Sequence, residues 1–184
     1  MELVFMLEEL SAKEFLDSLL PRILPPDVLF TTIPHHGKGD LRASLPRKLR
    51  AWRNPQARFV ILHDQDANDC LLLKEQLRQL CLQARPDLNP QPLIRIACRE
   101  LEAWHLGDFQ ALETAFPEFD SEKERGRAKF RDVDRLGNAA EELSKLIPEY
   151  QKVSGSRTLG TLVEVDNNTS KSFQIFISGV LAIQ

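Results

Sequence analysis

The sequence contains few cysteines and no hydrophobic run long enough to cross a membrane. No apolar stretch approaches the roughly 20 residues that a membrane-spanning helix needs. The first residues also lack the basic region and the small-residue cleavage site of a secretion signal. The three cysteines, Cys70, Cys81 and Cys98, are odd in number and lack metal-ligand spacing. We therefore expect a cytoplasmic protein that is not embedded in a membrane, with reduced and mostly buried thiols.

The charge balance gives no sign of a general nucleic-acid coat protein. The formal net charge is -3, whereas proteins that coat nucleic acids are strongly basic. The basic residues nevertheless form two groups, which are either solvated surface or local contacts of a nuclease. The groups are Arg42, Arg47, Lys48, Arg50 and Arg53, then Lys123, Arg125, Arg127, Lys129 and Arg131.

The chain lacks the Gly-rich linkers, internal repeats and low-complexity tracts that would divide it into parts. Its 184 residues suffice for one domain that buries roughly 70% of the surface of the unfolded chain. Apolar runs predict strands over residues 3–7, 28–33, 59–63 and 93–98. Helical periodicity predicts helices over residues 11–23, 41–52, 68–84, 108–115 and 139–147, and from 170.

This order of elements predicts a single-domain α/β fold. We expect a mostly parallel four-stranded sheet with helices on both faces as the core, over residues 1–108. An irregular and helical extension is expected over residues 109–184. Ser11 and Glu14 match a capping box at the first helix, and residues 155–166 are expected to form a loop.

The predicted strand over residues 59–63 is followed by two carboxylates, Asp64 and Asp66. Its apolar residues are continuous, as in a strand buried on both faces of a parallel sheet. In an extended backbone residues i and i+2 point to the same side, so Asp64 and Asp66 are expected to lie side by side. Two such charges repel unless a cation neutralises them, and carboxylate oxygens are ligands that Mg2+ prefers. Solvated acidic loop residues are the alternative.

Acidic residues also follow two other predicted strands. Glu8 and Glu9 come after the first strand, and Glu100 and Glu102 come after the fourth. Because the carboxyl ends of parallel strands meet at one edge of a sheet, these acids are expected to converge with Asp64. Grouping them without a cation would be costly, so the sequence predicts a site for Mg2+ or Mn2+. Glu100 and Glu102 would face different ways on a short helix, so only one of them can join the site.

Several short motifs resemble the Toprim domain of topoisomerases, primases and nucleases of the overcoming-lysogenization-defect type. The likeness rests on Glu8-Glu9-Leu10-Ser11 after an apolar strand and on Asp64-Gln65-Asp66 after a later one. More closely, the whole chain resembles the Toprim-like domain-of-unknown-function family numbered 4276. The matching pieces are Leu7-Glu-Glu-Leu-Ser-Ala12, Gly37-Lys-Gly-Asp-Leu41, Asp64-Gln-Asp-Ala-Asn-Asp-Cys70, Arg95-Ile-Ala-Cys-Arg-Glu-Leu-Glu-Ala-Trp104, Gly107-Asp108 and Ser170-Lys-Ser-Phe173.

The resemblance implies a catalytic acidic triad. Asp64 and Asp66 would hold Mg2+, and Glu8 would act as a general acid/base or as a further ligand. Toprim domains usually have glycine where this chain has Glu9, so Glu9 is a second candidate ligand, with Glu8 preferred. Glu102 is the next candidate, as a ligand for a second metal or as a group behind the ligands.

Other residues show weaker patterns. Lys38, between two glycines, is a candidate phosphate contact, although it lacks the spacing of a nucleotide-binding P-loop. Lys171, at the start of the last helix, is another candidate, with plain surface exposure as the alternative. Asp69 is expected to cap a helix rather than to bind metal. His35 and His36 are expected to be loop histidines of no consequence.

The first functional hypothesis is a Toprim-like, Mg2+-dependent phosphodiesterase or nuclease acting on nucleic acid. The resemblance implies an effector of an anti-phage or toxin-like system with a partner ATPase of the ABC/SMC type, and a second copy of the chain is a further candidate partner. The alternative is a non-catalytic interaction subunit of that ATPase which keeps the acids. A primase-like nucleotidyl transferase is disfavoured because no zinc-binding or initiation domain accompanies the predicted fold.

Overall fold

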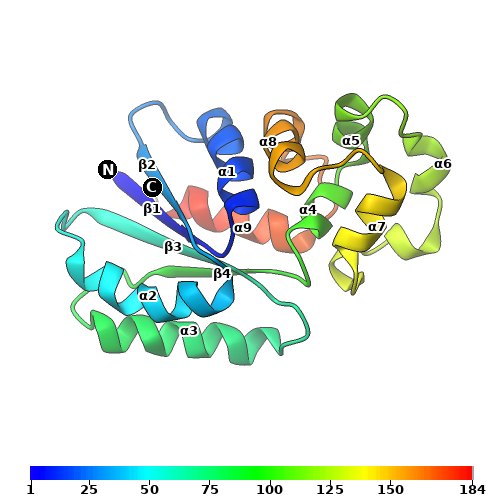
Figure 1. Ribbon diagram of the computed structural model, residues 1–184. Coiled ribbons are helices and arrows are strands. Elements are labelled where there is room, and N and C mark those ends of the chain that lie inside the picture. Colours follow the sequence, from blue (N-terminus) through cyan, green and yellow to red (C-terminus); the bar gives the residue numbers. More distant parts are fainter. Residues whose placement is uncertain (184) are drawn as a thin grey trace.

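The computed structural model describes residues 1–183, which form a four-stranded sheet whose neighbouring strands are all parallel. The strand order across the sheet is β2-β1-β3-β4 (Figure 1). The strands are β1 (Glu2–Leu7), β2 (Leu29–Pro34), β3 (Ala57–Asp64) and β4 (Leu93–Ala97). Leu7 of β1 pairs with Leu62 of β3, and Asp64 of β3 pairs with Ala97 of β4. The carboxyl ends of β1, β3 and β4 therefore lie next to one another.

The composition of the strands explains why β1 and β3 are central. Residues 3–7 of β1 are completely buried, and residues 59–62 of β3 are at most 4% exposed. Continuous apolar runs of this kind fit strands that are covered on both faces. Successive side chains alternate between the two faces, so Phe5 joins one hydrophobic core and Met6 joins the other.

Helices cover both faces of this sheet (Figure 1). One face carries α1 (Leu10–Ile23) and α9 (Lys171–Ala182), with α8 (Lys152–Leu162) packed on α1. The other face carries α2 (Lys38–Ala51) and α3 (Cys70–Ala84). Among residues 1–183, none of the helices is long and apolar enough to span a bilayer. The predicted α/β class, the parallel sheet and its two helical layers are confirmed.

The remaining short helices gather at one side of the sheet, to the right in Figure 1. They are α4 (Glu102–Leu106), α5 (Phe109–Ala115), α6 (Ser121–Arg125) and α7 (Ala139–Leu146), with two 3-10 turns at Ala128–Phe130 and Val133–Arg135. The predicted C-terminal extension therefore has two parts: the short helices lie beside the sheet, whereas α9 packs on β4 and covers the sheet.

Three local expectations are wrong. Helix α1 begins at Leu10 with Glu9 at its N-cap, so Ser11 lies inside the first turn and does not cap it. Helix α2 begins at Lys38, three residues before the predicted start at residue 41. The largest error concerns residues 155–166, most of which belong to α8 and not to a loop.

Tertiary contact explains why α8 forms despite a sequence rich in glycine, serine and threonine, which are poor helix formers. A Cβ atom at Gly160 would lie 2.3 Å from the carbonyl oxygen of Phe15, so only glycine allows α8 to approach α1 this closely. Arg22 of α1 donates hydrogen bonds to the carbonyls of Gly160 (3.1 Å) and Val163 (2.8 Å) at the end of α8. These bonds satisfy carbonyl groups that a helix end leaves unpaired.

Candidate functional site

The acids after β1, β3 and β4 meet at the carboxyl edge of the sheet, as the sequence predicts. Glu8 follows β1, Asp64 ends β3, and Glu102 begins α4 just after β4. Glu8 Oε2 accepts a hydrogen bond from the backbone N–H of Asp64 at 3.1 Å. The charges of Glu8, Glu102 and Glu9 all act on the Asp64 carboxyl. We call Glu8, Glu9, Asp64 and Glu102 the acidic cluster.

Glu8 is the member of the cluster that the fold holds most firmly. Its side chain is buried, with 8% of the residue exposed. The Nδ1 atom of His63, a completely buried residue, lies 3.1 Å from Glu8 Oε2 and also donates to the carbonyl of Asp64 at 2.6 Å. Glu8 is thus fixed to β3 through Oε2. Glu9 instead faces outward, toward Lys152, so the preference for Glu8 as the inner carboxylate agrees with its burial.

The surroundings of Asp64 disfavour the ionised form of its carboxyl group. Burial raises the pKa of Asp64 well above its ordinary value, and the neighbouring charges of Glu8, Glu102 and Glu9 raise it further. Only Lys152 acts in the opposite direction among the principal causes. A cation placed beside Asp64 would lower the pKa of its carboxyl group, because an opposite charge favours the ionised carboxylate.

Glu102 is almost completely buried, at 1% exposed, yet its Oε1 atom has no hydrogen-bond partner within residues 1–183. Burial raises the pKa of Glu102, and the nearby charge of Lys152 opposes this rise. Glu100 points elsewhere: its Oε2 accepts the backbone N–H of Ala140 at 2.8 Å, at the start of α7. Glu100 and Glu102 therefore face different ways, as expected, and only Glu102 belongs to the acidic cluster.

The expectation that Asp64 and Asp66 lie side by side on an extended backbone is wrong. Strand β3 ends at Asp64, and Asp66 adopts a left-handed conformation with φ of 52°. Its N–H donates to the carbonyl of Arg99 at 2.8 Å, which redirects the chain into a turn. The Asp66 carboxylate pairs with Lys38 Nζ at 2.9 Å. Lys38 is therefore at the site, but it contacts a carboxylate in this structure.

Lys152 is a residue of the site that sequence reasoning missed. It is the first residue of α8, and its Nζ lies 2.5 Å from Glu9 Oε2 and 3.7 Å from Glu102 Oε1. Its contact with the acids depends on the packing of α8 against α1, between segments more than a hundred residues apart. No local motif in the sequence signals such a contact.

The acidic cluster could hold a divalent cation only after side-chain movement. Among the residues that the structure describes, no three His, Cys, Asp or Glu side chains are arranged to hold a metal ion. Lysines stand next to the acids instead, with Lys152 on Glu9 and Lys38 on Asp66. The donor set nevertheless suits Mg2+ or Mn2+, because it consists of carboxylate oxygens and includes the unpartnered Oε1 of Glu102.

The other candidate residues lie apart from this cluster or support it. Lys171 is exposed at the start of α9, whereas Asp69 caps α3 by accepting the N–H of Leu72 at 2.9 Å, as predicted. His35 does lie in a loop, but it is buried and has a structural role, which was not expected. It is 5% exposed, and its Nδ1 donates to the carbonyl of Leu7 at 2.7 Å while its Nε2 accepts from Lys48 Nζ at 2.7 Å. His35 thereby braces the residue before Glu8.

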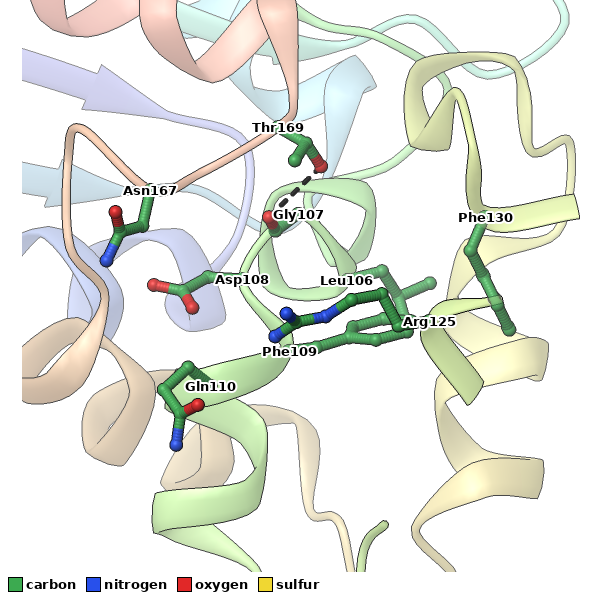
Figure 2. A pocket seen from close by; sticks show the side chains of 9 residues that line it. All are labelled: Leu106, Gly107, Asp108, Phe109, Gln110, Arg125, Phe130, Asn167 and Thr169. Atoms are coloured by element: carbon green, nitrogen blue, oxygen red, sulfur yellow. Dashed lines mark hydrogen bonds between the residues drawn. The ribbon is translucent and has the colours of Figure 1, made fainter. Parts of the chain in front are cut away.

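A hollow of about 460 Å³ lies at the C-terminal end of α4, beside Leu106 and Gly107 (Figure 2). Figure 2 shows Arg125 reaching toward Asp108 from α6. Both carboxylate oxygens of Asp108 are already used, by the N–H groups of Ala111 (3.1 Å) and Glu164 (2.9 Å). The lining contains no member of the acidic cluster; it consists of Leu106, Gly107, Asp108, Phe109, Gln110, Arg125, Phe130, Asn167 and Thr169.

Comparison with known proteins identifies a family. A family model described as "Domain of unknown function (DUF4276)" matches residues 7–181 of the chain. No curated protein and no solved structure matches the chain. The family match covers every residue of the acidic cluster.

Proposed function

Because the chain belongs to the DUF4276 family and gathers buried carboxylates at one edge of a parallel sheet, we propose that it is a Mg2+- or Mn2+-dependent phosphodiesterase. We propose further that this activity is that of a nuclease with a Toprim-like active site. The observation that carries the proposal is Glu102, which is 1% exposed and has an Oε1 without a hydrogen-bond partner in residues 1–183. Beside it, the Asp64 carboxyl has a raised pKa. Burying such groups without a function is costly.

Each residue has a role that follows from its surroundings. A bound Mg2+ would polarise a phosphate oxygen as a Lewis acid. The buried Glu102 and the half-buried Asp64 would supply oxygen ligands, and Asp66, which pairs with Lys38 in this structure, would be a further ligand. Glu8 is fixed to β3 through Oε2, which leaves Oε1 to take a proton from an attacking water or to serve as a further ligand.

The surroundings of the acids favour a polyanionic substrate. Lys38 begins α2, Arg99 follows β4 and Lys152 begins α8, so three separate segments place cationic side chains around the acids. The phosphate backbone of a nucleic acid presents regularly spaced negative charges that such a rim can contact. A chain with a net charge of -3 would bind nucleic acid through this local rim rather than through its overall charge.

A cleavage assay tests the proposal. Single-stranded DNA, double-stranded DNA and RNA are incubated with the wild type in Mg2+, in Mn2+ and in excess chelator, with and without an ATPase of the ABC/SMC type. We expect metal-dependent cleavage of at least one substrate, and a loss of at least a hundredfold in Asp64→Asn and Glu8→Gln. Asp69→Asn is the matched control, because Asp69 lies in the loop that follows Asp64 but caps α3. Cleavage by Asp64→Asn at the wild-type rate would contradict the proposal.

One observation favours a second candidate function, that of a non-catalytic interaction subunit of an ABC/SMC-type ATPase. Within residues 1–183 the acids do not form a ready metal site, and Lys38 and Lys152 neutralise two of them. In that case the wild type would bind the ATPase without cleaving any nucleic acid under any of these conditions. Asp64→Asn would then bind the ATPase as tightly as the wild type in a co-purification or calorimetric assay.

A further inference from the structure

Lys152 lies between two members of the acidic cluster. Its Nζ is 2.5 Å from Glu9 Oε2 and 3.7 Å from Glu102 Oε1. Glu102 is 1% exposed and its Oε1 has no hydrogen-bond partner in residues 1–183, so Lys152 is the cation nearest to an otherwise unsatisfied buried oxygen. Its ammonium group thus occupies the side of the acidic cluster on which Glu102, a proposed metal ligand, presents this free oxygen.

A lysine is electrostatically unfavourable at the position that Lys152 occupies in its own helix. This indicates that attraction to the acidic cluster holds its ammonium group there. Lys152 is the first residue of α8, and the positive end of the helix dipole disfavours a cation there. The acidic cluster provides the compensating attraction. Because no acidic residue occupies the first turn of α8, the compensation comes from Glu9 and Glu102 on other elements.

The backbone of Lys152 is fixed, whereas its side chain has room to move. Helix α8 is pressed against α1 at Gly160. The ring of Tyr150 packs where a Cβ at Gly155 would be, and its hydroxyl lies 3.5 Å from the carbonyl of Lys152. The Lys152 side chain is 45% exposed. Its ammonium can therefore leave Glu9 and Glu102 without any movement of α8.

We propose that Lys152 is an internal counter-cation of the acidic cluster, which holds Glu9 and Glu102 in the metal-free chain and which a divalent metal ion must displace. This inference rests on the proposed function, because it assumes that the cluster takes Mg2+ or Mn2+. It accounts for the lack of a ready three-ligand set in the described part of the chain. The displaced ammonium remains at the rim of the cluster, where it can contact a phosphate oxygen of the substrate.

Calorimetric titration of the full chain with Mn2+ and with Mg2+ tests the competition directly. Lys152→Gln removes the competing charge, so we expect its dissociation constant to fall about three- to tenfold. Lys152→Arg keeps the charge and should bind metal like the wild type. Lys145→Gln is the matched control, because Lys145 bridges Glu141 (2.6 Å) and Glu142 (3.6 Å) in a similar way on α7. Its metal affinity should not change.

Thermal unfolding gives a second readout that does not depend on activity. Without metal, Lys152→Gln leaves the acids unneutralised and should unfold at a lower temperature than the wild type. Saturating Mg2+ should then raise the melting temperature of Lys152→Gln by more than that of the wild type. In the control, Mg2+ should raise the melting temperature of Lys145→Gln by as much as that of the wild type.

The outcomes separate this inference from the proposed function. If the wild type binds metal, Asp64→Asn does not, and Lys152→Gln binds no more tightly than the wild type, the counter-cation role is overturned while the metal site stands. Weaker binding by Lys152→Gln would likewise overturn it, since Lys152 would then organise the ligands rather than compete. If neither wild type nor Lys152→Gln binds metal, both proposals fall.

Discussion

Replacing Asp64 with asparagine should stabilise the metal-free protein, although Asp64 belongs to the proposed active site. The cause is the raised pKa of Asp64, which results from burial and from the charges of Glu8, Glu102 and Glu9. A carboxyl group whose pKa is higher in the folded state than in the unfolded state weakens folding wherever it is ionised in the unfolded chain. Asparagine has nearly the same shape and removes this penalty.

The penalty depends on pH with a definite sign. It is absent below the unfolded pKa of about 4, because Asp64 is then protonated in both states. It grows as the pH rises from that value through the raised folded pKa and is constant above it. The nearby charge of Lys152 lowers the pKa of Asp64 and offsets part of the effect. We expect Asp64→Asn to be more stable than the wild type at pH 8, by an amount typical of a single substitution, on the order of 1 kcal/mol.

The assay is urea unfolding of the wild type and Asp64→Asn in excess chelator at pH 4, 6 and 8. The difference in unfolding free energy should be largest at pH 8 and should shrink toward zero at pH 4. Asp66→Asn is the control, because Asp66 forms an exposed pair with Lys38 and such pairs contribute little. Destabilisation by Asp64→Asn at pH 8, or a gain that is independent of pH, would refute the reasoning.

Three further predictions concern packing, capping and substrate contact. Gly160→Ala should cost about 1–3 kcal/mol in urea unfolding, because its Cβ would lie 2.3 Å from a carbonyl oxygen of α1, while Gly39→Ala, with open space around it, should not destabilise. Ser170→Ala should cost about 1–2 kcal/mol by thermal or urea unfolding, since the buried Ser170 hydroxyl accepts an α9 backbone N–H at 3.1 Å; an unchanged stability would contradict this. Lys38→Gln should weaken nucleic-acid binding and reduce the salt dependence by about one counterion, as fluorescence anisotropy at several salt concentrations can show.

The fold was predictable because its central features are local in sequence. The continuous apolar runs that form β1 and β3 can be recognised within a few consecutive residues. The alternation of such strands with helices along the chain then indicates a parallel sheet. Carboxyl ends of parallel strands meet at one edge. That rule alone predicts that Glu8, Asp64 and Glu102 lie close together. The hydrogen bond from Asp64 N–H to Glu8 confirms that the first two are in contact.

The parts that sequence reasoning missed depend on contacts between distant segments. Helix α8 has poor intrinsic helix propensity, and its glycines, which suggested a loop, are the residues that let it pack on α1. Lys152 was missed for the same reason. The turn at Asp66 depends on a hydrogen bond to Arg99, and the burial of His35 depends on Leu7 and Lys48. None of these partners is near in sequence.

The most direct test of the central claim is calorimetric titration of Mg2+ and Mn2+ into the wild type and into the double variant Asp64→Asn/Asp66→Asn. Thermal unfolding first establishes that both proteins are folded. We predict that the wild type binds at least one of the two metals and that the double variant binds at least tenfold more weakly. Equal binding by both proteins, or no binding by either, would contradict the metal site and with it the proposed phosphodiesterase.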